Sequence, residues 1–296
     1  MEPAPPIDPS LRIASVRLDV GDLARSSEFY ERVLGLPLIS RDEDRALLGA
    51  DARRPALQLS AVDQPTLASP HSTGLFHVAW LHPSRAALAD TVRRIAGARW
   101  PIDGASDHGV SEALYLSDPD GLGIEIYADR PREQWQRPAD GHGVRMFTLA
   151  LDIDDLLAQS PGQPQATVAP GTSIGHVHLK VADVPRAFGF YHDALGLQEQ
   201  AQLPSAAFLS AGGYHHHIGL NSWQSAGASP PADDAPRLRA IEFELGGGDA
   251  LAALRQRVAG AATDGAERPT TSSHDAGGVS VEDPDGNLLS FAAPSS

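Results

Sequence analysis

The sequence of 296 residues contains no cysteine, and it carries far fewer basic than acidic side chains. Without cysteine, neither a disulfide nor a thiolate metal site can form. Lysine and arginine together number 23 against 38 aspartates and glutamates, which gives a formal net charge of −15. Binding to nucleic acid or to anionic membranes needs clustered positive charge, so this balance argues against both.

Long apolar runs are also missing, and no stretch reaches the length of a membrane span. The opening segment, MEPAPPIDPS, has neither a basic nor an apolar region, so it is not expected to be a signal peptide. With 42% hydrophobic and 21% charged residues, the composition is typical of a globular protein. We therefore expect a cytoplasmic protein with one large or two ordinary domains.

Three stretches of the first half return in the second half. The pairs are SSEFYERVLGL (26–36) with AFGFYHDALGL (187–197), LADTVRRIAGA (88–98) with LAALRQRVAGA (251–261), and SDPDG (117–121) with EDPDG (282–286). Their offsets of 161, 163 and 165 residues indicate two duplicated halves with small insertions.

Each half divides again into two units, each with an opening strand, a helix and three further strands. The pattern predicts opening strands at 13–20, 75–81, 174–181 and 239–245, and helices at 23–34 and 84–97. We predict an α+β fold in which four βαβββ units pair into two cup-shaped modules. The predicted boundaries are 11–130 for the N-terminal module (units 11–62 and 75–130), 131–171 for a linker, and 172–296 for the C-terminal module (units 172–223 and 237–293).

Superposition of the units reveals positions whose chemistry varies. The opening strands align Ser15, His77, His176 and, within about a residue, Glu242, and the closing strands align Glu125 with Ser290. A single strand histidine is usually an ordinary core or surface side chain. If units two and three share a cup, however, His77, Glu125 and His176 converge in it. Two histidines and one carboxylate form the ligand set of non-haem Fe(II) sites with open positions, and Mn(II) or Zn(II) accepts the same ligands.

Several long strings in units two and three carry a family resemblance. They are GLFHVAW (74–80), GASDHGVSEALYLSDPDG (104–121), IEIYADRPREQW (124–135), IGHVHLKV (174–181) and FLSAGGYHHHIGLNSW (208–223). The chain resembles the vicinal oxygen chelate superfamily of glyoxalases, bleomycin-resistance proteins and extradiol dioxygenases. The more specific resemblance is to the bacterial catechol-2,3-dioxygenases of the CatE type.

The resemblance implies roles for particular side chains. His77, Glu125 and His176 would be the iron ligands, and His216 or its neighbour His215 would act as the acid–base histidine. Tyr115 would donate a hydrogen bond to a substrate oxygen. Weaker candidates for substrate contact are His178, His108 and His217. Conventional extradiol enzymes keep all three ligands in the C-terminal half, so this chain requires pairing of units across its halves.

The three consecutive histidines lie in what reads as one short strand. Alternation along a strand would direct His215 and His217 to one face and His216 to the other, unless Gly212 and Gly213 introduce a bulge. On this interpretation at most two of the three face the cavity together.

The leading hypothesis is extradiol cleavage of catechol or a substituted catechol by O₂, with Fe²⁺ (or Mn²⁺) as the cofactor. A glyoxalase-type isomerase or lyase that uses Zn(II), Ni(II) or Mn(II) is the second hypothesis, although such sites commonly use more carboxylate. The third is a protein that sequesters a ligand without turnover. The ring substituents and the choice between iron and manganese stay open, and we expect a homo-oligomer on general grounds.

Overall fold

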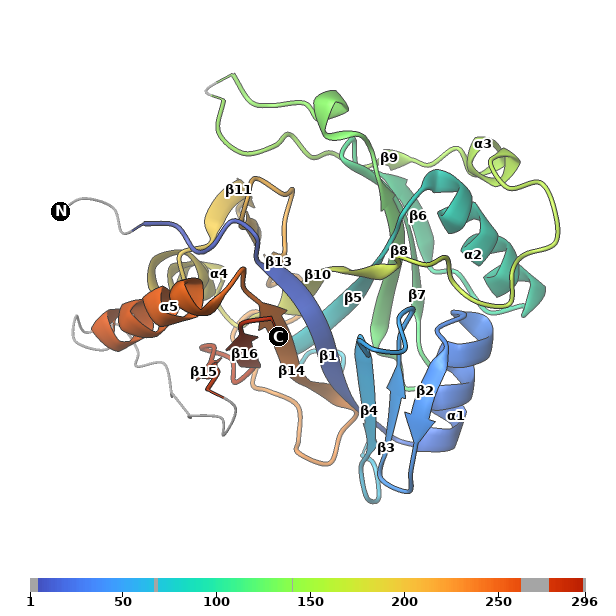
Figure 1. Ribbon diagram of the computed structural model, residues 1–296, viewed down its shortest axis with the longest axis horizontal. Coiled ribbons are helices and arrows are strands. Elements are labelled where there is room, and N and C mark those ends of the chain that lie inside the picture. Colours follow the sequence, from blue (N-terminus) through green and yellow to red (C-terminus); the bar gives the residue numbers. More distant parts are fainter. Residues whose placement is uncertain (1–4, 67–68, 140, 262–276, 295–296) are drawn as a thin grey trace.

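The computed structural model describes residues 5–66, 69–139, 141–261 and 277–294, and it confirms the predicted α+β fold (Figure 1). Unit one contains β1 (Arg12–Val20), α1 (Leu23–Glu28), η1 (Phe29–Val33), β2 (Leu38–Arg41), β3 (Arg45–Leu48) and β4 (Leu57–Ala61). Unit two contains β5 (Gly74–His82), α2 (Arg85–Gly97), β6 (Gly104–Asp107), β7 (Ser111–Ser117) and β8 (Gly123–Asp129).

The second half has the same order of elements. Unit three contains β10 (Ser173–Lys180), α4 (Val184–Gly189), η3 (Phe190–Ala194), β11 (Gln198–Leu203), β12 (Ala206–Ser210) and β13 (Ile218–Asn221). Unit four contains β14 (Arg237–Glu244), α5 (Gly248–Ala261), β15 (Val279–Glu282) and β16 (Leu288–Ala292). The span between α5 and β15, where the remaining strand of this unit would fall, lies largely outside the described residues.

The units pair across the two halves of the chain. One sheet has the strand order β11-β12-β13-β10-β5-β8-β7-β6-β9, and the other has β15-β16-β14-β1-β4-β3-β2. The central joints are antiparallel, between β10 and β5 in the first sheet and between β1 and β14 in the second. Units two and three therefore share one sheet, as the placement of the candidate ligands required. The boundaries 11–130, 131–171 and 172–296 remain a proposal about the duplicated sequence.

Apolar side chains between the helices and the sheets form one large core. Alternating residues of the opening strands face it, including Val16 and Leu18 of β1 and Val177 and Leu179 of β10. Figure 1 shows the helices along the outer sides of the sheets, where they cover this apolar face. The opposite, concave face of each sheet is thereby left to carry other side chains.

Two bulges aim side chains of the central strands onto the concave face. Opposite His178, strand β5 carries both Phe76 and His77, and strand β10 carries an extra residue at Gly175. A bulge places successive side chains on the same face and bends the strand. A Cβ at Gly175 would lie 1.7 Å from the hydroxyl oxygen of Tyr127, so only glycine fits there.

One local prediction was wrong, and one was confirmed with a change of helix type. The helix expected over 23–34 is present, as an α-helix to Glu28 and then as the π-helical η1 to Val33. The histidine triplet is not in a strand but in the loop between β12 and β13. Gly212 and Gly213 both have positive φ angles, +60° and +66°, and they turn the chain before the histidines.

The predicted linker 131–171 contains structure of its own. It includes η2 (Arg132–Gln134), β9 (Leu149–Ala150), which pairs with β6, and α3 (Ile153–Ala158). This segment thus adds β9 to one edge of the larger sheet. Among the helices of the described chain, none has the length and apolar character to cross a membrane.

We predict that Gly175→Ala lowers the free energy of unfolding by about 1–3 kcal/mol, because the added methyl group overlaps Tyr127 and must displace it or the strand. Chemical denaturation measures this change. Gly104→Ala on β6 is the matched control, since its Cβ would lie 3.9 Å from the nearest atom, an ordinary contact. Equal stability of the two variants would contradict the proposed close packing.

Candidate metal centre

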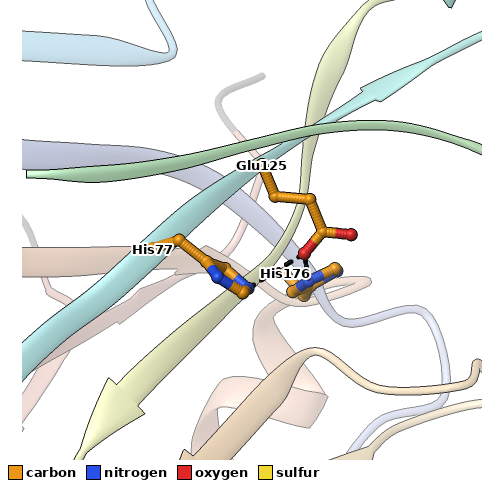
Figure 2. A group of neighbouring side chains, drawn as sticks. All are labelled: His77, Glu125 and His176. Atoms are coloured by element: carbon orange, nitrogen blue, oxygen red, sulfur yellow. Dashed lines mark hydrogen bonds and ion pairs between the residues drawn. The ribbon is translucent and has the colours of Figure 1, made fainter. Parts of the chain in front are cut away.

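Three side chains of the larger sheet converge at its centre (Figure 2). His77 comes from β5, Glu125 from β8 and His176 from β10. These strands are neighbours in the order β10-β5-β8, so side chains on their concave sides lie next to one another. One potential ligand atom from each residue lies within 4.8 Å of the others, and all three residues are buried.

The histidine nitrogens in this group are only partly satisfied by the carboxylate of Glu125. Nε2 of His77 lies 2.9 Å from Oε2 of Glu125, but its direction does not make a hydrogen bond, and no other protein partner serves it. Nε2 of His176 lies 3.1 Å from the same oxygen at hydrogen-bonding geometry. Buried polar atoms normally have partners, so an unpartnered nitrogen facing a carboxylate fits a bound cation. The residues present therefore suit a metal ion.

Burial also sets the charge states that a metal needs. Desolvation lowers the pKa of His176 to about 4, although Glu125 acts in the opposite direction. Burial alone would raise the pKa of Glu125, but its electrostatic interaction and hydrogen bond with His176, followed by the nearby imidazole of His77, hold that pKa well below its usual range. At neutral pH the group thus contains a neutral imidazole at His176 and an ionised carboxylate, both ready to ligate.

His216 lies directly against this group. Its ring centroid is 4.0 Å from that of His176, closer than the 5.8 Å that separates His215 from His176. Burial lowers the pKa of His216 well below its usual range, so the ring is neutral at neutral pH. A neutral imidazole beside a metal group can accept a proton.

His215 connects His216 to a carboxylate. Nδ1 of His215 lies 2.8 Å from Nδ1 of His216, and its Nε2 lies 3.0 Å from Oδ1 of Asp129. Tyr214 donates a hydrogen bond to the same oxygen at 3.3 Å. The sequence interpretation missed Asp129, although it ends the strand that carries Glu125 and stands within one of the quoted motifs.

The predicted linker covers this histidine loop. Trp135 is buried, and its ring centroid lies 5.4 Å from that of His215 and 6.0 Å from that of Tyr214. Trp135 donates its indole N–H to the carbonyl of Arg130 at 2.8 Å. A segment expected to join the halves therefore contributes one wall of the site.

Tyr115 and His108 form a pair on the other side of the group. The hydroxyl of Tyr115 lies 2.6 Å from Nε2 of His108, and Nδ1 of His108 lies 3.0 Å from the carbonyl oxygen of Phe147. Since a carbonyl only accepts, Nδ1 carries the proton and the hydroxyl of Tyr115 donates to Nε2. The ring of Tyr115 lies 5.7 Å from that of His77. The two residues thus meet beside the site, as the sequence suggested.

His178 shares the concave face with His176, as predicted. Its ring centroid lies 5.0 Å from that of His77, and Nδ2 of Asn221 lies 3.1 Å from its Nε2. A Cβ at Gly219 would come within 2.8 Å of this imidazole, so the glycine makes room for it. His217 differs, because its Nδ1 accepts the backbone N–H of Ala211 at 3.2 Å and closes the loop.

The second sheet lacks a comparable group among the described residues. At the corresponding place, the hydroxyl of Ser15 donates to Oε2 of Glu242, and the hydroxyls of Ser280 and Ser290 lie 3.0 Å apart. These polar groups satisfy one another. The second sheet therefore differs from the first because it has serines and Glu242 at the positions where the first sheet has its candidate metal ligands.

Comparison with known proteins identifies the family of this chain. A family model described as Glyoxalase/Bleomycin resistance protein/Dioxygenase superfamily matches residues 12–126 and 173–291. The chain belongs to this superfamily. The resemblance stated from the sequence motifs is thus confirmed at the level of the family.

Two kinds of curated relative are similar to this chain. Catechol-2,3-dioxygenase from Bacillus subtilis (strain 168) is 43% identical over 229 residues, which cover 76% of this chain and 80% of that protein. Lactoylglutathione lyase from Escherichia coli O157:H7 is 26% identical over 131 residues, which cover 40% of this chain and 94% of that protein.

Solved structures share the fold at low sequence identity. A putative dioxygenase from Bacillus subtilis subsp. subtilis str. 168 has a TM-score of 0.63 at 14% identity, covering 98% of this chain and 86% of that one. Glyoxalase I from Zea mays has a TM-score of 0.57 at 18% identity, covering 95% and 92%. At this identity the likeness establishes the architecture of the superfamily.

We predict that Glu125→Gln weakens Fe²⁺ binding by about 100-fold or more, because the only negative charge of the group is lost. Anaerobic titration with Fe²⁺ followed by metal analysis of the desalted protein measures the affinity. Glu242→Gln in the second sheet is the matched control and should bind like the natural chain. Unchanged binding by Glu125→Gln would show that metal is held elsewhere.

Proposed function

We propose that this protein is an extradiol ring-cleaving dioxygenase that acts on catechol or a substituted catechol, with Fe²⁺ held by His77, Glu125 and His176. The observation that carries the proposal is the buried group of two imidazoles and one carboxylate, in which Nε2 of His77 and Nδ1 of His176 have no hydrogen-bond partner in the protein. This donor set is that of non-haem iron sites with open positions, and Mn²⁺ is the alternative cation. The 43% identical catechol-2,3-dioxygenase supports the choice of reaction.

When bound, the iron would supply a Lewis-acidic and redox-active centre for the diol and for O₂. The protein's own groups then manage protons and orientation. His216 lies closest to the ligand group and is neutral at neutral pH, so it is suited to accept a phenolic proton from the substrate.

The Asp129–His215–His216 chain decides which nitrogen of His216 is available. Oδ1 of Asp129 accepts a hydrogen bond from Nε2–H of His215, and the other nitrogen of that ring, Nδ1, then offers its lone pair. Nδ1–H of His216 then donates to this nitrogen, 2.8 Å away. Nε2 of His216 is left without a proton, and it is the atom we assign as the base.

Tyr115 is assigned to hold a substrate oxygen. Its hydroxyl proton points to His108, so its oxygen can accept a hydrogen bond from a substrate hydroxyl, and it can donate if His108 gives up that bond. Burial, followed by the charge of Glu125, raises the pKa of Tyr115 well above its usual value, which keeps the phenol protonated. A neutral hydroxyl beside the ligand group favours orientation over acid chemistry.

A glyoxalase-type isomerase is the second candidate, and the 26% identical lactoylglutathione lyase over 131 residues is the observation in its favour. The ligand group argues against it, since it holds a single carboxylate where such sites commonly use more. The isomerisation consumes no O₂, so a single measurement separates the two reactions.

The test is oxygen uptake by protein loaded anaerobically with Fe²⁺ and then given catechol in aerated buffer. We expect uptake equal to the catechol consumed, with a ring-opened semialdehyde as the product, and no uptake by His176→Ala. Uptake that does not differ between the two proteins would overturn the proposal. Metal retained by the natural chain without uptake from catechol, methylcatechols or 2,3-dihydroxybiphenyl would also overturn it.

We predict that Asp129→Asn lowers the turnover number by about 10²–10³-fold with little change in KM or in iron content. The amide can donate to Nε2 of His215, which reverses the chain of hydrogen bonds and leaves the proton on Nε2 of His216. Steady-state oxygen uptake measures both constants. Asp193→Asn is the control, because Asp193 also pairs with a histidine, His192, at 2.7 Å, but both side chains of this pair are exposed and neither belongs to the relay. A turnover number within a factor of three of the natural value would refute the relay.

A further inference from the structure

A series of aromatic rings leads from the ligand group to the surface. The ring centroid of Phe76 lies 5.2 Å from that of His77 and 5.1 Å from that of His178. Trp223 follows, 5.4 Å from Phe76 and 5.6 Å from His178. Phe208 joins from β12, 5.7 Å from His178 and 5.0 Å from His216. We call Phe76, His178, Phe208 and Trp223 the aromatic wall.

Trp223 ends this wall in an unusual state for its residue type. It is 52% exposed, and yet it is held in place by two hydrogen bonds. Its indole N–H donates to the hydroxyl of Ser205 at 3.2 Å, and its backbone N–H donates to Oδ1 of Asn221 at 3.3 Å. A large apolar ring that is fixed but uncovered is suited to contact with a ligand.

The wall itself carries no fixed charge. The one ring nitrogen of His178 that has a side-chain partner, Nε2, lies 3.1 Å from Nδ2 of Asn221. Within the described residues, the arginine found over aromatic rings is Arg132. It lies over Trp135 and Tyr214, which are not part of the aromatic wall. Lys180, the only lysine of the chain, lies two residues beyond His178, and its Nζ donates to the carbonyl of Pro70 at 3.3 Å.

We infer that the aromatic wall is a binding surface for the ring side of the substrate and that it selects catechols with an apolar, uncharged substituent, such as an aryl group. This inference rests on the proposed function, because it takes the two hydroxyls of the diol to lie at the ligand group. An aryl substituent directed along Phe76 would stack against Trp223. A carboxylate in the same place would lose part of its hydration among these rings, and Lys180, the cation of β10, donates to the carbonyl of Pro70.

The test compares three diols by calorimetric titration of Fe²⁺-loaded protein under anaerobic conditions, so that binding is read without turnover. The diols are catechol, 2,3-dihydroxybiphenyl and 2,3-dihydroxybenzoate, the last two with their substituents at the same ring position. We expect 2,3-dihydroxybiphenyl to bind about tenfold or more tightly than catechol, and the benzoate more weakly than either. Trp223→Ala should reduce the tenfold preference to about threefold or less while the affinity for catechol itself stays within about twofold. Trp223→Phe should keep most of the preference.

Leu149→Ala is the matched control, since Leu149 is 58% exposed on β9 at the opposite edge of the same sheet. Loss of the preference in this variant and not in Trp223→Ala would overturn the inference, because the substituent would then lie on the other side of the site. Equal affinities for catechol and 2,3-dihydroxybiphenyl, or tighter binding of the benzoate, would also overturn it.

These titrations, taken together with the oxygen-uptake measurement, separate this inference from the proposed function. Discrimination by the wall without oxygen uptake would leave the ring-binding surface in place and reject the dioxygenase reaction. Oxygen uptake from catechol without discrimination would reject the wall and leave the reaction.

Discussion

The antiparallel pairing of β5 with β10 is the interaction on which the site depends. It joins the two halves of the chain and places His77 and His176 on the same concave side of the sheet. Parallel pairing of β5 with β8 adds Glu125 beside them. Pairing of consecutive units would have separated these donors. The bulges at Phe76 and Gly175 adjust the direction of the side chains within this joint. A register slip of one residue would turn the histidines toward the helices.

Around this joint, burial determines how each polar group can act. Desolvation keeps His176 and His216 neutral, whereas the carboxylate of Glu125 stays ionised because imidazoles surround it. The histidine loop is covered by Trp135 and anchored to Asp129, so its imidazoles have fixed partners. The same sheet and its histidine loop thus bring a candidate cation site, a candidate base and the aromatic wall close together. In the second sheet, Ser15 and Glu242 simply bond to each other.

Much of this arrangement was accessible from the sequence because duplication allowed one unit to be compared with another. The comparison exposed His77, Glu125 and His176, and their placement required pairing across the halves, which the strand order confirms. Strand alternation failed at the histidine triplet, because Gly212 and Gly213 form a turn that no hydrophobic period reveals. Asp129 and Trp135 were missed for another reason. Their importance lies in contacts with a loop more than 75 residues away along the chain.

The repeated DPDG motif, which carries no chemistry in the site, is explained by packing. Asp118 accepts a hydrogen bond from the hydroxyl of Tyr30, and Asp283 accepts one from that of Tyr191. Each half is thus held together internally, while the sheets pair between halves.

The measurement that tests the account most directly is reaction of the Fe²⁺-loaded protein with catechol under ¹⁸O₂, with mass spectrometry of the product. The account predicts a single ring-opened product that carries both labelled atoms. A product with an intact ring, or one that carries no label, would contradict it.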